Sequence, residues 1–267
     1  MNILVLFAAL AISHYASGID RLRSGDRLID WMESMRERWS SPSWLDLAWV
    51  LGVSVIGGGL LSVIAYAIGD SWLWALVALV VLLFCLGPRD LDRDVDQALA
   101  QGENSALGLS ATDDAHVAGM RIYVAALARW FGVIVWFVLL GIPGALLYRI
   151  TERVCERNVG TTDGEWLFRL RFFLEWPVLV FMMVSSALTN DFDRVYQAWH
   201  RYRKERIDQG HGAWMIHREL LETLADAVVP EGLDQRGGIQ LAHHFVWRLL
   251  ILWLVILSIL LLTGLLS

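Results

Sequence analysis

The stretch LAWVLGVSVIGGGLLSVIAYAIG (residues 47–69) is followed, after the single residue Asp70, by SWLWALVALVVLLFCLGP (residues 71–88). Neither stretch contains a charged side chain, and each reaches the length of about 18–20 residues that a helix needs to cross a bilayer. Lipid offers no hydrogen-bond partners to open backbone groups, so such a segment has to be helical. The two stretches predict a hairpin of transmembrane helices that turns at Asp70.

Apolar runs of the same kind stand at both ends of the chain. Residues 1–19 lack the basic start of a signal peptide, so we expect this run to be retained as a helix. The C-terminal run predicts a span over 246–266. Only 19% of the residues are charged, against about 25% in soluble domains, and 56% are hydrophobic. The expected fold class is an all-α integral membrane protein with four transmembrane helices and a single membrane domain over 1–267.

Two weaker apolar stretches lie in the middle of the chain and predict central helices over 124–150 and 167–190. Residues 130–148 are uncharged but include the break Gly141-Ile142-Pro143-Gly144. Irregular backbone at membrane depth is tolerated where protein surrounds it. We therefore favour re-entrant or interfacial helices, with full crossing as the alternative.

The basic residues predict the orientation, because cytoplasmic loops are enriched in Lys and Arg. Arginines gather in 20–44, 89–123 and 191–245, and Lys204 is the only lysine. These segments should face the cytoplasm of a bacterial inner membrane, with residues 194–229 forming an amphipathic helix. The net charge of −6 argues against nucleic-acid binding.

The acidic segment from Asp90 to Asp96 has the spacing of a calcium loop at Asp90, Asp92 and Asp94. Val95 and Gln101, however, replace the turn glycine and the closing glutamate of such a loop. Carboxylates are favoured at a helix N-terminus, so the segment predicts the acidic start of a helix.

Other catalytic and metal-binding patterns are missing from the sequence. There is no P-loop, Cys85 and Cys155 form no disulfide framework, and Ser185-Ser186 has no histidine nearby in sequence. The histidines lack the spacing of metal ligands; they include His211, His217, His243 and His244. We expect no catalytic residue, no metal and no cofactor, with nucleotide binding left open.

Arginines near the apolar stretches suggest a charged site at the cytoplasmic membrane face. Arg149, Arg153 and Arg157 are spaced by four residues and share one helical face. Such a face could bind an anionic ligand, and lipid headgroups are the alternative occupant. The candidate ligand-binding residues are Arg89, Asp90, Asp94, Arg149, Arg153, Arg169, Arg171 and Glu175. Glu175 stands four residues after Arg171, the spacing of a helical ion pair.

Small residues in the second run would let another helix approach closely. They are Ser54, Gly57, Gly58 and Gly59. We expect packing within the chain, against residues 71–88, and keep a homodimer as the alternative.

Three motifs together resemble the AmpE family of bacterial inner-membrane proteins. They are Gly87-Pro-Arg89-Asp90-Leu91 followed by Gly102-Glu103, then Trp136 to Arg149, then Leu174-Glu175-Trp176-Pro177. The resemblance covers most of the chain. It implies a modulator of β-lactamase induction that is linked to peptidoglycan recycling and to the AmpD amidase, with a peptidoglycan-derived or other anionic metabolite as ligand.

The chain is also distantly similar to CbiB/CobD, the membrane synthase of cobalamin assembly. The acidic and amide cluster of that enzyme is replaced here by residues 123–131, and its Arg-Leu-Asp-Asp by Arg169 to Phe172. An amide-forming reaction needs such acids to hold phosphates and move protons. A non-enzymatic modulator is therefore the leading interpretation, and an amide-forming enzyme with another substrate, a transporter or a structural membrane protein are the alternatives.

Overall fold

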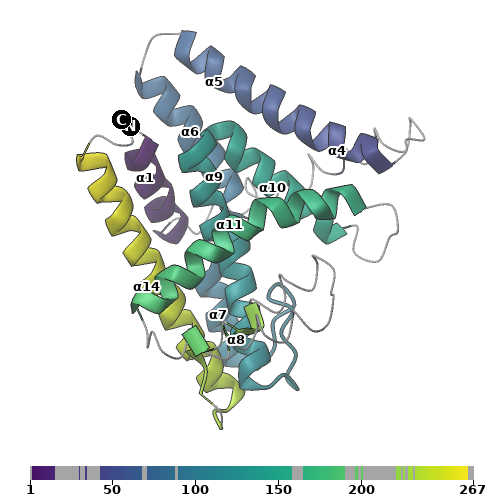
Figure 1. Cartoon of the computed structure of the whole chain (residues 1–267), viewed down its shortest axis with the longest axis vertical. Coiled ribbons are helices and arrows are strands. Elements are labelled where there is room, and N and C mark those ends of the chain that lie inside the picture. The colour runs from purple at the N-terminus through teal and green to yellow at the C-terminus, as the bar shows by residue number, and fades with distance from the viewer. Residues whose placement is uncertain are drawn as a thin grey trace. The chain divides into compact units, whose positions relative to one another are not determined.

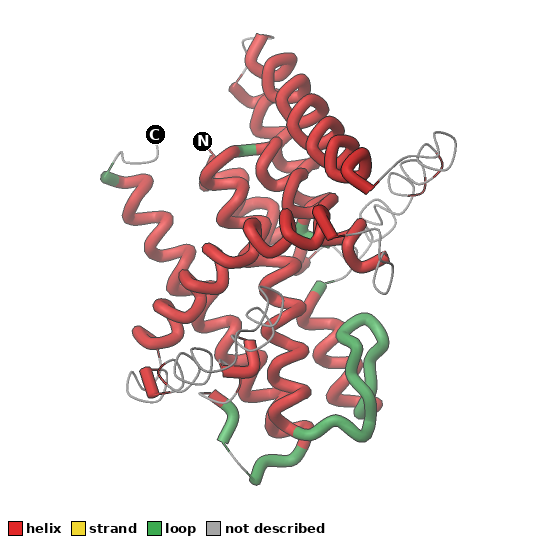
Figure 2. The backbone as a smooth tube through the Cα atoms, turned by 45° about the vertical axis from the view of Figure 1, so that its right-hand side comes forward, coloured by secondary structure: helices red, strands yellow, loops and turns green. Residues whose placement is uncertain are grey.

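The structure is a computed structural model of the chain in which most of the apolar helices are described. The described residues are 2–15, 30, 34, 43–67, 71–87, 90–157, 165–189, 196–197, 200, 221–223, 225, 228–230 and 232–263. In this part of the chain the regular structure is helical, with one isolated bridge between Asn104 and Leu109 and no β-strand (Figure 2). The predicted all-α class is therefore confirmed.

Two compact units divide the chain that the sequence predicts as one domain. Figure 1 labels the α-helices named below. Unit 1 comprises Met1–Asp90, Ala128–Leu174 and Ser267, and unit 2 comprises Leu91–Leu127 and Glu175–Leu266. The helices of unit 1 are α1 (Asn2–Tyr15), α4 (Ser43–Leu51), α5 (Gly58–Ala67), α6 (Ser71–Cys85), α9 (Gly132–Leu140) and α10 (Ile142–Arg157). Those of unit 2 are α7 (Leu91–Gln101), α8 (Ala115–Ala126) and α14 (Gln235–Leu262). Helix α11 (Glu165–Thr189) contributes to both units, and two π-helical segments are η1 (Gly52–Gly57) and η2 (Leu127–Phe131).

Four helical stretches are long and apolar enough to cross a membrane: Leu47–Ile64, Ala115–Leu140, Trp166–Thr189 and Gln235–Leu260. The first and last correspond to the predicted spans 47–69 and 246–266, although α14 begins eleven residues before 246. Trp166–Thr189 matches the second central stretch. Ala115–Leu140 overlaps the first but begins nine residues before 124, so the end of segment 89–123, expected to be cytoplasmic, belongs to this candidate span. The predicted spans 1–19 and 71–88 contain the shorter apolar helices Leu4–Ser13 and Trp72–Cys85.

A sharp break separates the two halves of the first central stretch. Helix α9 ends at Leu140, Gly141 adopts φ 68° and ψ −146°, and α10 begins at Ile142. A positive φ of this kind suits glycine, which has no Cβ. The predicted break is therefore confirmed, whereas the single helix expected over 124–150 is two helices.

The second central stretch forms one helix, as the sequence predicts. Pro177, which lacks a backbone N–H, lies inside α11 without ending it. The helix runs from Glu165 to Thr189, close to the expected 167–190.

Helix α10 is the central packing element of unit 1 and contacts α4, η1, α5, α6 and α9. A Cβ placed on Gly58 would lie 2.7 Å from the Cα atom of Pro143, so the two helices approach closely there. The small residues thus pack within the chain as expected at Gly58, but the partner is α10, because the bend at Gly141 brings Pro143 to the glycine. No atom lies within 4 Å of the Cβ positions of Gly57 and Gly59.

Unit 2 is built on the contact between α8 and α14. Gly238 of α14 lies against the backbone of Ala115, and the rings of Tyr123 and Phe245 meet edge to face at 6.1 Å between centroids. The indole N–H of Trp253 donates to the hydroxyl of Ser185 at 2.8 Å, which ties α11 to α14. Helix α7 starts with Asp92 and Asp94 in its first turn, as the sequence predicts.

Several expectations concern residues outside the described part of the chain. They are the ends of the terminal spans, most of segment 20–44, Arg89, most of the helix expected over 194–229, His211 and His217.

Candidate functional site

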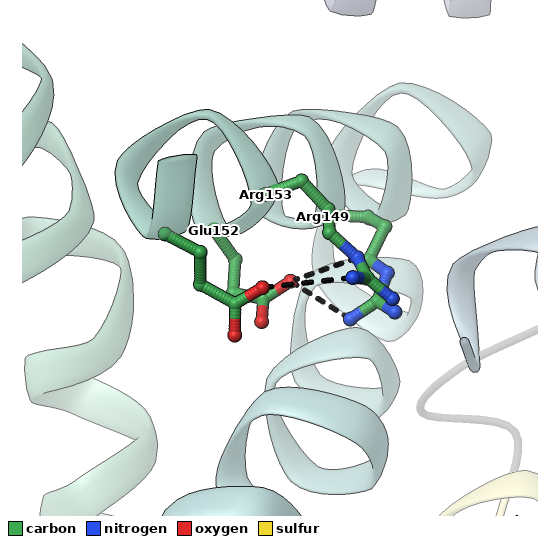
Figure 3. Close-up of polar contacts among 4 residues, drawn as sticks. Arg149, Glu152 and Arg153 are labelled. Carbon is green, nitrogen blue, oxygen red and sulfur yellow. Dashed lines mark hydrogen bonds and ion pairs between the residues drawn. The ribbon is translucent and has the colours of Figure 1, made fainter. Parts of the chain in front are cut away.

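The second half of α10 carries alternating basic and acidic residues. Arg149, Glu152, Arg153 and Glu156 follow one another at spacings of three, one and three, which places them on one face of the helix. We call these four residues the α10 charge ladder. Figure 3 shows the side chains of Arg149 and Arg153 extending toward Glu152.

The innermost contact of the ladder is a buried ion pair. Arg149 donates from Nη1 to Oε2 of Glu152 at 2.8 Å, and the two side chains are only 5% and 3% exposed. Removing one partner of a buried pair leaves an uncompensated charge and costs about 3–5 kcal/mol. This pair is therefore part of the framework of unit 1.

The outer contacts of the ladder are looser. Arg153 Nε lies 3.9 Å from the same Glu152 oxygen, and Arg153 Nη1 lies 3.6 Å from Oε2 of Glu156. About a quarter of the Arg153 side chain is exposed. Arg153 is therefore accessible to a ligand, whereas Arg149 is enclosed.

Glycines make room for the inner end of the ladder. A Cβ on Gly87 would lie 2.6 Å from Nη2 of Arg149, and Gly87 has a φ of 97°. A Cβ on Gly132 would collide with the ring of Tyr148, the residue before Arg149. Both approaches require glycine, so the burial of this part of α10 depends on sequence far from it.

The outer carboxyl group has a raised pKa. Burial, followed by the charge of Glu152 and a hydrogen bond with its side chain, raises the pKa of Glu156 from 4.5 to about 7, while Arg153 and Arg149 act in the opposite direction. Half of the Glu156 side chain is exposed, so water reaches it from one side. The group can therefore change its charge near neutral pH.

The other predicted site residues that the structure describes are Asp90, Asp94, Arg169, Arg171 and Glu175. The Arg169 guanidinium lies 5.0 Å from the centroid of the Trp166 ring. Arg157, which is not in the predicted set, donates to Asp30 at 2.7 Å. Asp90 is buried and Arg171 half-buried, both in unit 1, while Asp94 and Glu175 are buried in unit 2. Of the predicted set, the structure brings Arg149 and Arg153 together.

Glu152 and Glu156 were not among the predicted site residues. The sequence could have predicted them, because each stands three residues after an arginine of the predicted set, which is a spacing of helical ion pairs. The predicted set contains arginines spaced by four residues on α10 and omits the acids near them.

A second polar cluster lies in unit 2. Oδ1 of Asp92, on α7, accepts the indole N–H of Trp247 at 2.8 Å and lies 2.6 Å from Nε2 of His243, both on α14. The sequence does not reveal this contact, because 151 positions separate Asp92 from His243. The cluster ties the acidic start of α7 to α14.

Comparisons of the chain with protein-family models, curated proteins and solved structures find no match. Among the described residues, no group of three or more His, Cys, Asp or Glu side chains could hold a metal ion.

Proposed function

We propose that this chain is a regulatory protein of the bacterial inner membrane, of the AmpE type, that responds to an anionic metabolite through α10. Its role would be the modulation of β-lactamase induction in connection with peptidoglycan recycling. The observation that carries the proposal is the position of Arg153, an accessible arginine directly beside the buried pair of Arg149 and Glu152.

The membrane assignment draws support from where the apolar side chains lie. Only 17% of the stretch Leu47–Ile64, and 28% of the apolar 18-residue window within Gln235–Leu260, is buried inside the protein. Large apolar side chains such as Ile56, Leu60 and Ile251 are exposed. Soluble monomers rarely expose contiguous apolar surface on this scale, and lipid would cover it.

The ligand class follows from the chemistry of the accessible arginine. A guanidinium donates paired hydrogen bonds to a carboxylate or a phosphate, and such charge-assisted bonds are strong. The 2.8 Å contact between Arg149 and Glu152 fixes the turn of α10 from which Arg153 extends. Muropeptides carry carboxylates and are therefore suitable ligands, while anionic lipid headgroups present the same chemistry.

A binding experiment separates these two sources. The full chain is placed in nanodiscs of zwitterionic lipid and titrated with an anionic muropeptide by calorimetry. Loss of one charge-assisted contact in Arg153→Gln should weaken binding about tenfold, which corresponds to ~1.4 kcal/mol. The matched control is Arg121→Gln, an exposed arginine of unit 2, which should bind as the wild type does.

Equal affinity of wild type and Arg153→Gln would overturn the proposed site. If the muropeptide does not bind, and nanodiscs with anionic lipid stabilise the wild type but not Arg153→Gln, the site is a headgroup contact and the sensing function is wrong. In cells, the gene carrying Arg153→Gln should fail to restore normal β-lactamase induction to a strain that lacks it.

A further inference from the structure

The α10 charge ladder holds two carboxyl groups one helical turn apart. Glu152 and Glu156 stand at positions i and i+4 of one helix, where side chains are neighbours. Arg149 Nη1 approaches Glu152 to 2.8 Å, whereas the nearest basic group to Glu156 is Arg153 Nη1 at 3.6 Å. Glu152 therefore has a close, buried partner, and Glu156 has a distant one.

Two neighbouring carboxylates repel each other when both are ionised, and a shared proton relieves the repulsion. Arg149 Nη1 lies 2.8 Å from Glu152 inside the protein and compensates the charge of an ionised Glu152. The proton therefore belongs on Glu156, whose side chain is half exposed and lies 3.6 Å from the Arg153 guanidinium.

We propose that the Glu152–Glu156 pair is a proton-binding site that changes the charge of the α10 ladder when it takes up one proton. With both carboxyls ionised, the charges of Arg149, Arg153, Glu152 and Glu156 sum to zero, and protonation of Glu156 leaves one net positive charge. The site requires no ligand, so it stands independently of the function proposed above.

The surroundings of Glu156 decide where this site titrates. The charged groups that act on it are Glu152, Arg153 and Arg149, and together with burial they place its pKa at about 7. The next basic residue, Arg157, is bonded to Asp30 at 2.7 Å.

The helices packed against α10 add few titratable groups. Helix α9 and η1 contain none, and α6 contains Cys85, which faces Arg149. Helices α4 and α5 carry Asp46 and Tyr66, whose side chains lie outside the described atoms. Among the described residues, the charged groups that act on Glu156 therefore belong to the ladder itself.

Infrared difference spectroscopy of the full chain in zwitterionic nanodiscs tests the proposal, because the C=O stretch of a protonated carboxyl is separate from histidine signals. Titrated without ligand, the wild type should lose this band with a midpoint of about 7. Glu156→Gln should abolish that transition. The matched control Glu103→Gln, on an exposed loop of unit 2, should retain it.

Two neighbouring variants should shift the midpoint in opposite directions. Glu152→Gln removes the like charge and should lower it, whereas Arg153→Gln removes a favourable charge and should raise it. If Glu156→Gln retains the near-neutral carboxyl transition, or if Arg153→Gln lowers its midpoint, the proposal is wrong. Should Glu152→Gln fail to fold because Arg149 loses its partner, the other two variants still decide the question.

Discussion

Gly87 has a φ of 97°, and the guanidinium of Arg149 lies 2.6 Å from the position that a Cβ would occupy. Replacement by alanine adds a Cβ that only a shift of the buried Arg149 could accommodate. We expect Gly87→Ala to destabilise the protein by about 2–4 kcal/mol, from backbone strain together with disturbance of a buried ion pair. The measurement is thermal unfolding in detergent. Gly232→Ala is the control, because Gly232 has a φ of 86° with no atom near its Cβ position, and it should cost only the strain. Equal losses would show that Arg149 does not depend on Gly87.

Glu156 should give the protein a pH-dependent stability of known sign. Its folded-state pKa of about 7 lies above the ordinary 4.5, so the folded protein binds the proton more tightly than the unfolded chain does. The stabilisation is fully present below pH 4.5 and is lost as the pH rises to about 7. Over this window the melting temperature of Glu156→Gln should fall less than that of the wild type, while Glu103→Gln follows the wild type. Parallel curves for wild type and Glu156→Gln would contradict this account.

At the scale of the elements, the α8–α14 contact of unit 2 rests on a close approach of backbones. A Cβ on Gly238 would lie 2.8 Å from the Cα of Ala115, and backbone cannot move aside as a flexible side chain can. Gly238→Ala should therefore lower the stability by about 1–3 kcal/mol through overpacking. Gly59→Ala, in a helix with open space at its Cβ position, should be neutral or stabilising, since alanine favours helix by about 1 kcal/mol. Thermal unfolding of the two variants checks this, and a neutral Gly238→Ala would remove the packing argument.

The helices themselves were largely predictable, because apolar stretches of spanning length depend on composition alone. The break at Gly141 was predictable as well, since Gly141-Ile142-Pro143-Gly144 disfavours continuous helix. The helix expected over 167–190 was predictable too, and α11 follows it although Pro177 lies inside the helix. At the candidate site, the spacing of the arginines on α10 could be predicted from the sequence. The burial of Arg149 could not, since it depends on Gly87, sixty-two positions away in the sequence.

For the whole molecule, the sequence predicts that the arginine-rich segments face the cytoplasm, and the structure supports a multi-pass membrane protein. Four helical stretches of sufficient length and the exposed apolar side chains on them support it. With residues 71–88 crossing between them, the positive-inside rule predicts Asp70 outside and Ser110 inside.

Reporter fusions in a bacterial host test both the membrane assignment and the predicted orientation of the chain. Two reporters are each fused after Asp70 and after Ser110: alkaline phosphatase, which is active only outside the cytoplasm, and a fluorescent protein that matures only inside. The membranes are then washed with alkaline carbonate, which removes proteins that are not embedded in them. We predict phosphatase activity at Asp70 and fluorescence at Ser110, with both fusions retained in the membrane. Recovery of the chain in the carbonate supernatant, or fluorescence at Asp70 with phosphatase activity at Ser110, would contradict the account.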